Sequence, residues 1–320
     1  MTGLSQAPRP TSVAPLRPPM LRPGDKVRLI SPASAPKPEA LARGVRLLRE
    51  WGLEVEYAPH ALDKHGYLAA PDSQRLADLN QALADPSVRA VICTRGGYGT
   101  QRILDGIDPE PVRQDPKLVT GFSDITALQM WLWQATGLAS LHAPIAAWSD
   151  TRNGPASIES LRSAAMSAEP IVVRRELSEP TSELVTPGRA SGALLGGNVS
   201  LLAQGVGTSD LGDLSGAILF LEDVGEEPYR LDRMLTQLRR CGVLTNVAGI
   251  ALGQFTDCIG APDTWSVVEM LRDRLCDLGV PVLGGLPVGH GPAQRTIPLG
   301  VPAVLDADAG TLTAEPAVHA

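Results

Sequence analysis

The sequence predicts an α/β protein that contains a parallel, doubly wound sheet. Two observations carry this prediction. Short apolar segments typical of buried strands alternate with segments in which apolar residues recur at helical spacing, and the connections between them are short. Ligands of such sheets bind beyond the carboxyl ends of the strands, so a functional site is expected in the loops that leave those ends.

The first part of the chain, 21–150, shows this alternation most clearly. Leu41, Val45 and Leu48 are spaced to lie on one face of a helix. We interpret 21–150 as the first domain, preceded by a disordered leader at 1–20. The expected strands are 26–31, 53–57, 90–94 and 118–121, and the expected helices are 38–51, 73–84, a segment that runs through Leu104 and a segment that ends at Thr136.

The composition changes between 151 and 189, where proline, serine, glutamate and arginine dominate. We interpret 151–189 as an interdomain linker with one helix near 158–166, and 190–316 as the second domain. The expected elements of that domain are a helix that opens after Asn198, strands at 217–221 and 247–252, helices at 231–240 and 265–278, and β-like segments at 297–299, 303–305 and 311–313.

The bulk composition excludes several classes of function. The chain has 320 residues, 43% of them hydrophobic, and its net charge of −7 argues against nucleic acid or an anionic membrane surface as a partner. No apolar run approaches the length of a membrane span, and no signal-peptide core is visible, so we expect a cytoplasmic protein. The four cysteines form no Cys-x-x-Cys pair and the histidines show no metal-binding spacing, which predicts free thiols and no metal.

The tetrapeptide Gly-Phe-Ser-Asp at 121–124 lies between an apolar strand and a helix. Such a turn lifts the hydroxyl of Ser123 clear of the sheet, and it points the amides at the start of the helix toward whatever the serine attacks. The match to a nucleophile elbow is partial, because Ile125 stands where a second glycine is usual. The alternative interpretation is that Ser123 only caps the helix.

A glycine-rich loop, Arg95-Gly96-Gly97-Tyr98-Gly99, follows the strand at 90–94. Glycine allows backbone N–H groups to approach a ligand closely, so three interpretations are open: a donor to an oxyanion, a phosphate cradle, or a structural turn. The loop contains neither Gly-Lys-Ser/Thr nor Gly-x-Gly-x-x-Gly, which weighs against phosphate.

Two further candidates lie in the second domain. Glu222 and Asp223 end the strand at 217–221, where acidic side chains suggest a functional carboxylate, although a solvated acidic loop is the alternative. His290 stands between two glycines on sharply turning backbone, which favours a chemical role over packing, with an ordinary loop histidine as the alternative. His142 follows an apolar stretch that predicts burial.

Together these segments resemble the LD-carboxypeptidase family of serine peptidases, from about Leu21 to Thr313. One such segment alone would be weak evidence, but seven in the family's order are specific. They are LRPGDKVRLISPAS, CTRGGYGTQRIL, LVTGFSDITAL, GALLGGNVSLL, ILFLEDVGEEPYRLDRMLTQLR, GIALGQFTDC and LPVGHG. The resemblance implies a flavodoxin-like or glutaminase-like N-terminal domain and a smaller C-terminal α/β domain.

The resemblance also implies a catalytic triad that spans both domains. In it Ser123 is the nucleophile, His290 the general base and Glu222, rather than Asp223, the carboxylate that orients the histidine. The active site is then expected in the cleft between the domains. The mechanism requires no metal and no cofactor.

Other site residues follow from the same resemblance. The oxyanion-hole amides fall on Asp124 and on the glycine-rich loop, where we prefer Gly97. A carboxypeptidase needs a cation for the terminal carboxylate of its substrate. The candidates for binding the substrate are Arg95, Gly96 and Arg230.

The implied activity is hydrolysis of the bond to the terminal D-alanine of murein tetrapeptide, in peptidoglycan recycling, by a homodimer. An alternative within the family is a microcin C self-immunity type of peptidase, which cuts an acyl-sulfamoyl or phosphoramidate nucleotide conjugate and stacks its base on an aromatic residue. The segment 150–189 has no aromatic residue and only Trp148 lies near, which favours murein. The remaining alternatives are a non-catalytic peptide-binding protein and a nucleotide-binding protein.

Overall fold

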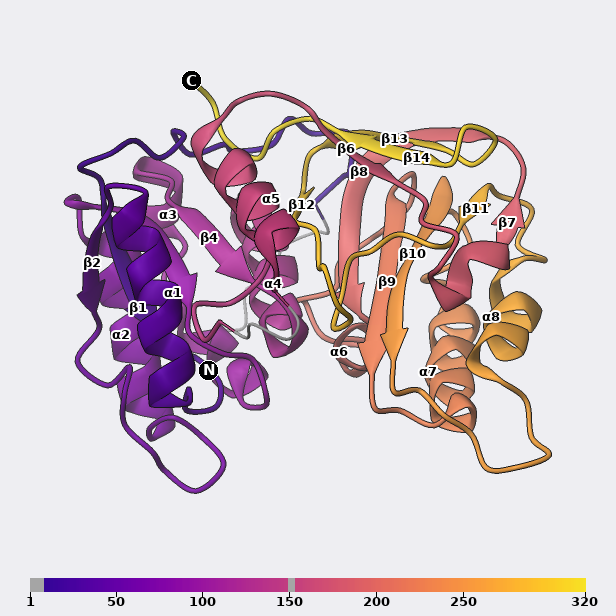
Figure 1. Cartoon of the computed structure of the whole chain (residues 1–320), viewed down its shortest axis with the longest axis horizontal. Helices are drawn as coiled ribbons and strands as arrows, with labels where there is room; N and C mark the ends of the chain where they lie inside the picture. Colours follow the sequence, from indigo (N-terminus) through magenta and orange to yellow (C-terminus); the bar gives the residue numbers. More distant parts are fainter. Residues whose placement is uncertain (1–8, 149–152) are drawn as a thin grey trace.

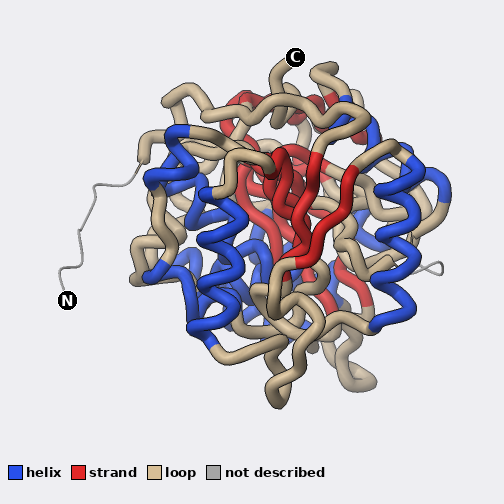
Figure 2. The backbone as a smooth tube through the Cα atoms, turned by 90° about the vertical axis from the view of Figure 1, so that its left-hand side faces the viewer, coloured by secondary structure: helices blue, strands red, loops and turns tan. Residues whose placement is uncertain are grey.

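The structure is a computed structural model that describes residues 9–148 and 153–320. Two α/β lobes lie side by side, each with its own sheet (Figure 1). Turned by 90°, the strands lie in the middle of the molecule with helices on either side (Figure 2). Of the expected leader, residues 1–8 lie outside the described residues, whereas Leu16 is held at the N-terminal lobe, where its amide donates to the carbonyl of Gly137 at 2.8 Å.

The N-terminal sheet has the strand order β12-β5-β4-β3-β1-β2. Strands β1 to β5 run parallel in the order 2-1-3-4-5 of a flavodoxin-like sheet, which confirms the predicted fold class. Strand β12 joins the edge in the antiparallel direction. The strands are β1 (Lys26–Ile30), β2 (Glu54–Tyr57), β3 (Val88–Cys93), β4 (Leu118–Gly121), β5 (Ser140–His142) and β12 (Ile297–Leu299).

Helices cover both faces of this sheet, because its strands bury apolar residues on both sides. On one face, helix α1 buries Leu41, Val45 and Leu48 in a core to which α5 also contributes. Helices α2 and α4 pack on the opposite face. The helix expected after the glycine-rich loop is a short 3-10 helix, η1. The helices are α1 (Pro38–Glu50), α2 (Asp72–Ala84), η1 (Thr100–Gly106), α3 (Glu110–Gln114), η2 (Ser123–Ile125), α4 (Thr126–Thr136) and α5 (Pro155–Met166).

The C-terminal sheet has the order β6-β14-β13-β8-β9-β10-β11-β7, with parallel strands β8 to β11 in its centre and antiparallel strands at both edges. Among the described residues this sheet has eight strands and the N-terminal sheet has six. Apolar residues of α6, α7 and α8 pack together on this sheet. The elements are β6 (Ile171–Arg174), η3 (Pro180–Glu183), β7 (Val185–Thr186), β8 (Arg189–Asn198), α6 (Val199–Gln204), β9 (Ile218–Val224), α7 (Pro228–Arg240), β10 (Gly249–Thr256), α8 (Val267–Leu275), β11 (Val282–Leu283), β13 (Pro302–Asp306) and β14 (Thr311–Ala314).

The chain crosses between the lobes more often than its sequence suggests. The segment 151–189, expected as a linker with one helix, contributes α5 and two edge strands of the C-terminal sheet, β6 and β7. Strand β12 comes from the expected second domain but pairs with β5 in the N-terminal sheet. The loop that precedes β12 is therefore attached to both lobes. No helix in the described ranges is both long and apolar enough to cross a membrane.

Candidate active site

Ser123 lies at the turn between β4 and α4. Its φ of +65° is in the left-handed region, which residues other than glycine rarely adopt and which persists only where the surroundings hold it. In the structure, neither η2, which begins at this residue, nor α4 has a side-chain cap hydrogen bond. The geometry thus resembles a nucleophile elbow more than a helix cap.

The glycine-rich loop lies directly against this turn. A Cβ added at Gly96 would lie 3.0 Å from Cβ and 3.2 Å from Oγ of Ser123, so a larger residue would crowd the serine side chain. Gly97 has a φ of +108°, and a Cβ there would lie 2.5 Å from Oγ of Ser34. The structure therefore places Gly96 beside the serine hydroxyl and Gly97 against the loop after β1.

The side chain of Asp124 joins the turn to the same loop. Its Oδ2 accepts a hydrogen bond from the backbone amide of Thr100 at 2.9 Å, and the residue is buried. This bond fixes the residue that follows Ser123, whose amide is the expected oxyanion donor.

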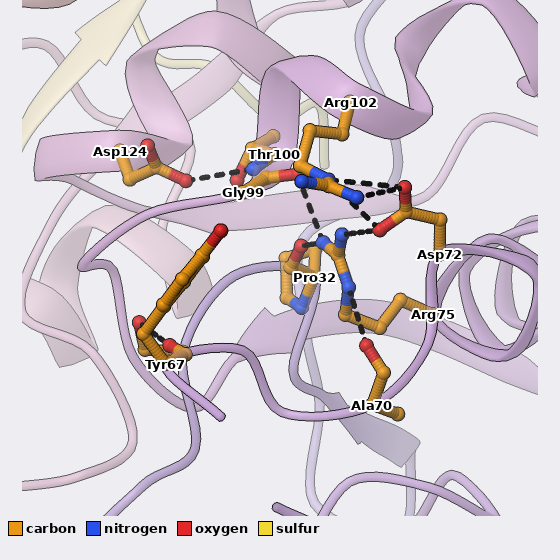
Figure 3. A network of polar contacts seen from close by, with 10 residues as sticks. Pro32, Tyr67, Ala70, Asp72, Arg75, Gly99, Thr100, Arg102 and Asp124 are labelled. Carbon is orange, nitrogen blue, oxygen red and sulfur yellow. Dashed lines mark hydrogen bonds and ion pairs between the residues drawn. The ribbon is translucent and has the colours of Figure 1, made fainter. Parts of the chain in front are cut away.

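A buried arginine, Arg75, forms a hydrogen bond with the last residue of the glycine-rich loop, Gly99 (Figure 3). Sequence reasoning missed Arg75, because nothing in the pattern of α2 marks this position as buried. The residue is only 2% exposed. Its guanidinium makes hydrogen bonds to the carbonyl oxygens of Pro32, Ala70 (3.0 Å) and Gly99 (2.9 Å), and an ion pair of 2.5 Å with Asp72.

Glu222 and His290 form a buried pair. Oε2 of Glu222, at the end of β9, lies 2.6 Å from Nδ1 of His290, in the loop between β11 and β12. Burial works to raise the pKa of Glu222, but the charge of His290 and its hydrogen bond outweigh burial and lower it. Glu222 is therefore a carboxylate at neutral pH and can fix the tautomer of the imidazole.

The ring of Phe122 connects the two lobes at this point. It lies 4.6 Å from the imidazole of His290, measured between ring centroids, at an interplanar angle of 50°. Phe122 directly precedes Ser123, so this contact brings the serine turn of one lobe next to the histidine–carboxylate pair. Sequence reasoning did not single out Phe122.

Asp223, the alternative to Glu222, has different partners. Its Oδ2 accepts from the amide and the hydroxyl of Ser200 at 3.0 and 2.9 Å, and its Oδ1 from Nδ2 of Asn198 at 3.1 Å. Burial and the neighbouring charge of Glu222 raise its pKa to about 6. Of the two carboxylates, Glu222 contacts His290 in the described residues. This contact is expected of the carboxylate that orients the imidazole.

His142 is fully buried, as its apolar flanks predict, and lies close to this pair. Its ring packs against Phe122 and Phe220, at centroid distances of 5.8 and 5.1 Å. Neither ring nitrogen has a hydrogen-bond partner within the described residues. Burial lowers its pKa to about 4, so the imidazole is uncharged at neutral pH.

The two arginine candidates are both exposed. Nη1 of Arg95, immediately before Gly96, donates to the carbonyl of Ala35 at 3.0 Å. Arg230, in the first turn of α7, lies 3.6 Å from Glu227, and its guanidinium is 5.7 Å from the ring of Tyr229. No cluster of three or more potential metal ligands occurs in residues 9–148 and 153–320.

The comparison with known proteins starts from this two-lobed α/β fold, in which Phe122, the residue before Ser123, packs on the imidazole of a buried acid–imidazole pair. The chain matches the LD-carboxypeptidase N-terminal domain over residues 27–143 and the LD-carboxypeptidase C-terminal domain over 191–305. The chain therefore belongs to the LD-carboxypeptidase family, as its motifs predict.

Relatives cover almost the whole chain. A Bacillus subtilis protein named "Probable murein peptide carboxypeptidase" is 39% identical over 94% of this chain and 95% of its own. The murein tetrapeptide carboxypeptidase of Pseudomonas aeruginosa is 36% identical over 88% and 93%. Among solved structures, an MccF-like protein from Bacillus anthracis superposes with a TM-score of 0.85 at 26% identity, over 94% and 99%. MccF in complex with glutamyl sulfamoyl guanosine, at 22% identity and a TM-score of 0.84 over 94% and 98%, shares the fold.

Proposed function

We propose that this chain is a serine carboxypeptidase that hydrolyses the L,D-peptide bond to the terminal D-alanine of murein tetrapeptide. The observation that carries the proposal is the buried hydrogen bond of 2.6 Å between Glu222 and His290, whose ring lies against the residue that precedes Ser123. The names of the two bacterial relatives support a murein peptide as the substrate class.

In the proposed mechanism, Oγ of Ser123 attacks the scissile carbonyl carbon while Nε2 of His290 takes the hydroxyl proton. Glu222 holds Nδ1–H and stabilises the imidazolium that forms, which its lowered pKa permits because it stays ionised. His290 then gives the proton to the nitrogen of the departing D-alanine. A water molecule, deprotonated by the same imidazole, attacks the ester carbonyl carbon. The bond from this carbon to Oγ breaks, the imidazolium returns its proton to Oγ of Ser123, and the tripeptide leaves as a carboxylic acid.

Two backbone amides are proposed to hold the oxyanion. One is the amide of Asp124, fixed by the bond between its side chain and Thr100. The other is the amide of Gly97, which directly follows Gly96, where an added Cβ would lie 3.2 Å from Oγ of Ser123. A developing alkoxide needs such fixed donors at about 2.7–3.1 Å.

For the terminal carboxylate of the substrate we favour Arg95 over Arg230. Arg95 adjoins Gly96, whose backbone approaches the serine hydroxyl. Its exposed guanidinium can form two parallel hydrogen bonds with a carboxylate.

The proposal extends to a cytoplasmic homodimer that acts in peptidoglycan recycling. The four cysteines are free thiols, which is consistent with a reducing compartment. Light scattering of the purified protein measures the oligomeric state, with twice the 33.7 kDa of one chain expected.

A nucleotide conjugate is the alternative substrate, suggested by the structural likeness to MccF. A base needs an aromatic platform, and Trp148 was the candidate. Trp148 is only 4% exposed and its Nε1 donates to the carbonyl of Asn153 at 3.1 Å. This burial supports the murein substrate.

Mass spectrometry of D-alanine release tests the proposal. Murein tri-, tetra- and pentapeptides are compared with an aminoacyl-sulfamoyl adenosine. We expect release from the tetrapeptide alone. Hydrolysis of the adenosine conjugate without release of D-alanine would replace the proposal with its alternative.

A further inference from the structure

The two lobes meet where α4 begins and β8 ends. Oγ1 of Thr126 accepts a hydrogen bond from the backbone amide of Asn198 at 3.1 Å, and both residues are buried. The preceding backbone is equally close, since a Cβ added at Gly197 would lie 2.5 Å from Oγ1 of Thr126. The lack of a side chain at Gly197 leaves room for the hydrogen bond between Thr126 and Asn198, which we name the Thr126–Asn198 clasp.

The hydroxyl of Thr126 bonds across the lobes and does not cap its own helix. Thr126 is the first residue of α4, one position beyond the N-cap, where a side-chain oxygen would accept from an amide of the helix. Helix α4 has Ile125 as its N-cap and no side-chain cap bond. The hydroxyl accepts instead from the other lobe, so this threonine serves the interface rather than its helix.

Each end of the clasp leads to a different part of the proposed triad. Thr126 is three residues after Ser123, in the segment that continues the strained turn. Asn198 is the register partner of Glu222 between β8 and β9, and its Nδ2 approaches Oε1 of Glu222 at 3.4 Å. The other oxygen of Glu222 contacts His290. The clasp therefore links the serine turn to the carboxylate that orients the base.

The loop that carries His290 is also attached to the N-terminal lobe, at the end of the loop that follows His290. Beyond His290 the chain enters β12, where Ile297 pairs with His142 of the N-terminal sheet. The base is thus anchored through β12, and its carboxylate partner through the clasp. Two attachments thus join the N-terminal lobe to the residues that flank the imidazole.

We propose that Thr126 is a positioning residue, whose hydroxyl holds the lobes in the register that sets Ser123 opposite the Glu222–His290 pair. This inference rests on the proposed serine mechanism. Loss of the hydroxyl is expected to misalign the serine and the imidazole without touching the substrate, and a misplacement of about 1 Å costs on the order of 10²-fold in rate.

Thr126→Val removes the acceptor and keeps the shape, while Thr126→Ser keeps the hydroxyl. Thr136→Val is the matched control: this threonine of the same helix is also buried, and its Oγ1 accepts from the amide of Leu138 at 3.2 Å, within one lobe. If Thr126→Val does not fold, Thr126→Ala removes the same acceptor without placing a methyl group against the amide.

Two readouts are measured on the full chain. One is kcat and KM for D-alanine release from murein tetrapeptide. The other is the proton NMR signal of His290 Nδ1–H, which needs no substrate. We expect Thr126→Val to lower kcat about 10²-fold with KM unchanged and to shift or broaden the NMR signal. Thr126→Ser, which keeps the hydroxyl, is expected to have a kcat and an NMR signal close to those of the wild type. Thr136→Val is expected to resemble the wild type.

The inference is overturned if Thr126→Val keeps the wild-type kcat and NMR signal, or if Thr136→Val loses as much activity. The two proposals fail separately. If the wild type releases no D-alanine, the proposed substrate is wrong and the NMR signal alone decides: an unchanged signal in Thr126→Val rejects the clasp, and a shifted one supports it.

Discussion

Nδ1 of His290 lies 2.6 Å from Oε2 of Glu222, and both side chains are buried although they come from segments 68 residues apart. A hydrogen bond in such surroundings fixes the ring and leaves Nε2 to act as the base. The bond joins the parallel centre of the C-terminal sheet to a loop that continues into the N-terminal one.

Glu222→Gln is expected to lower kcat about 10³- to 10⁴-fold with little change in KM, because a neutral amide neither enforces the productive tautomer nor stabilises the imidazolium. Steady-state kinetics of D-alanine release measures this. Asp223→Asn is the comparison variant and is expected to lose less, since Asp223 bonds to Ser200 and shares Asn198 with Glu222, whereas Glu222 itself bonds to His290. Equal losses in the two variants would remove the distinction between the two carboxylates.

Gly96→Ala is expected to lower kcat ~10²-fold without unfolding the protein. The new Cβ would lie 3.2 Å from Oγ of Ser123, so the hydroxyl must move, although the φ of Gly96 is not in the left-handed region. Gly154→Ala is the control, because a Cβ there meets no atom of residues 9–148 and 153–320 within 4 Å. Kinetics and circular dichroism of both variants check this. A Gly96→Ala enzyme with the wild-type kcat would show that the close approach of Gly96 to Ser123 is not required for catalysis.

His142→Leu is expected to change how stability depends on pH. Burial lowers the pKa of His142 to about 4 from 6.5, so below pH 6.5 the unfolded chain binds a proton that the folded protein does not. The wild type therefore loses stability as the pH falls from 6.5 to 4, and the leucine variant avoids this loss. We expect the variant to gain about 2 kcal/mol on the wild type between pH 7 and pH 5.

Urea unfolding of both proteins at the two pH values measures that gain. A difference in unfolding free energy that does not change with pH would mean that His142 is protonated in the folded protein.

The parallel N-terminal sheet was predictable because it depends on local patterns. Apolar strands alternate with helices, and β3 and α1 follow the periodicity of their own residues. The pairing of β12 with β5, and the strands at 171–174 and 185–186, join segments far apart in the chain, and no local pattern records such pairing.

In the candidate site, too, local motifs predicted some residues, whereas residues with long-range partners were missed. Gly-Phe-Ser-Asp and Gly-His-Gly marked Ser123 and His290 through their turns. The local pattern alone does not separate the adjacent acids at 222 and 223, because strand alternation decides which one faces the histidine; the choice of Glu222 came from the family resemblance. Arg75 and Thr126 were missed, since they bond to backbone atoms remote in the sequence, the carbonyl of Gly99 and the amide of Asn198, and such pairing leaves no local signal.

The most direct test of the central claim is D-alanine release by Ser123→Ala compared with the wild type, followed by mass spectrometry in a preparation free of host peptidases. Without the nucleophile, kcat is expected to fall by about 10⁴-fold or more, while thermal stability and tetrapeptide binding remain. A Ser123→Ala protein that releases D-alanine at the wild-type rate would contradict the account.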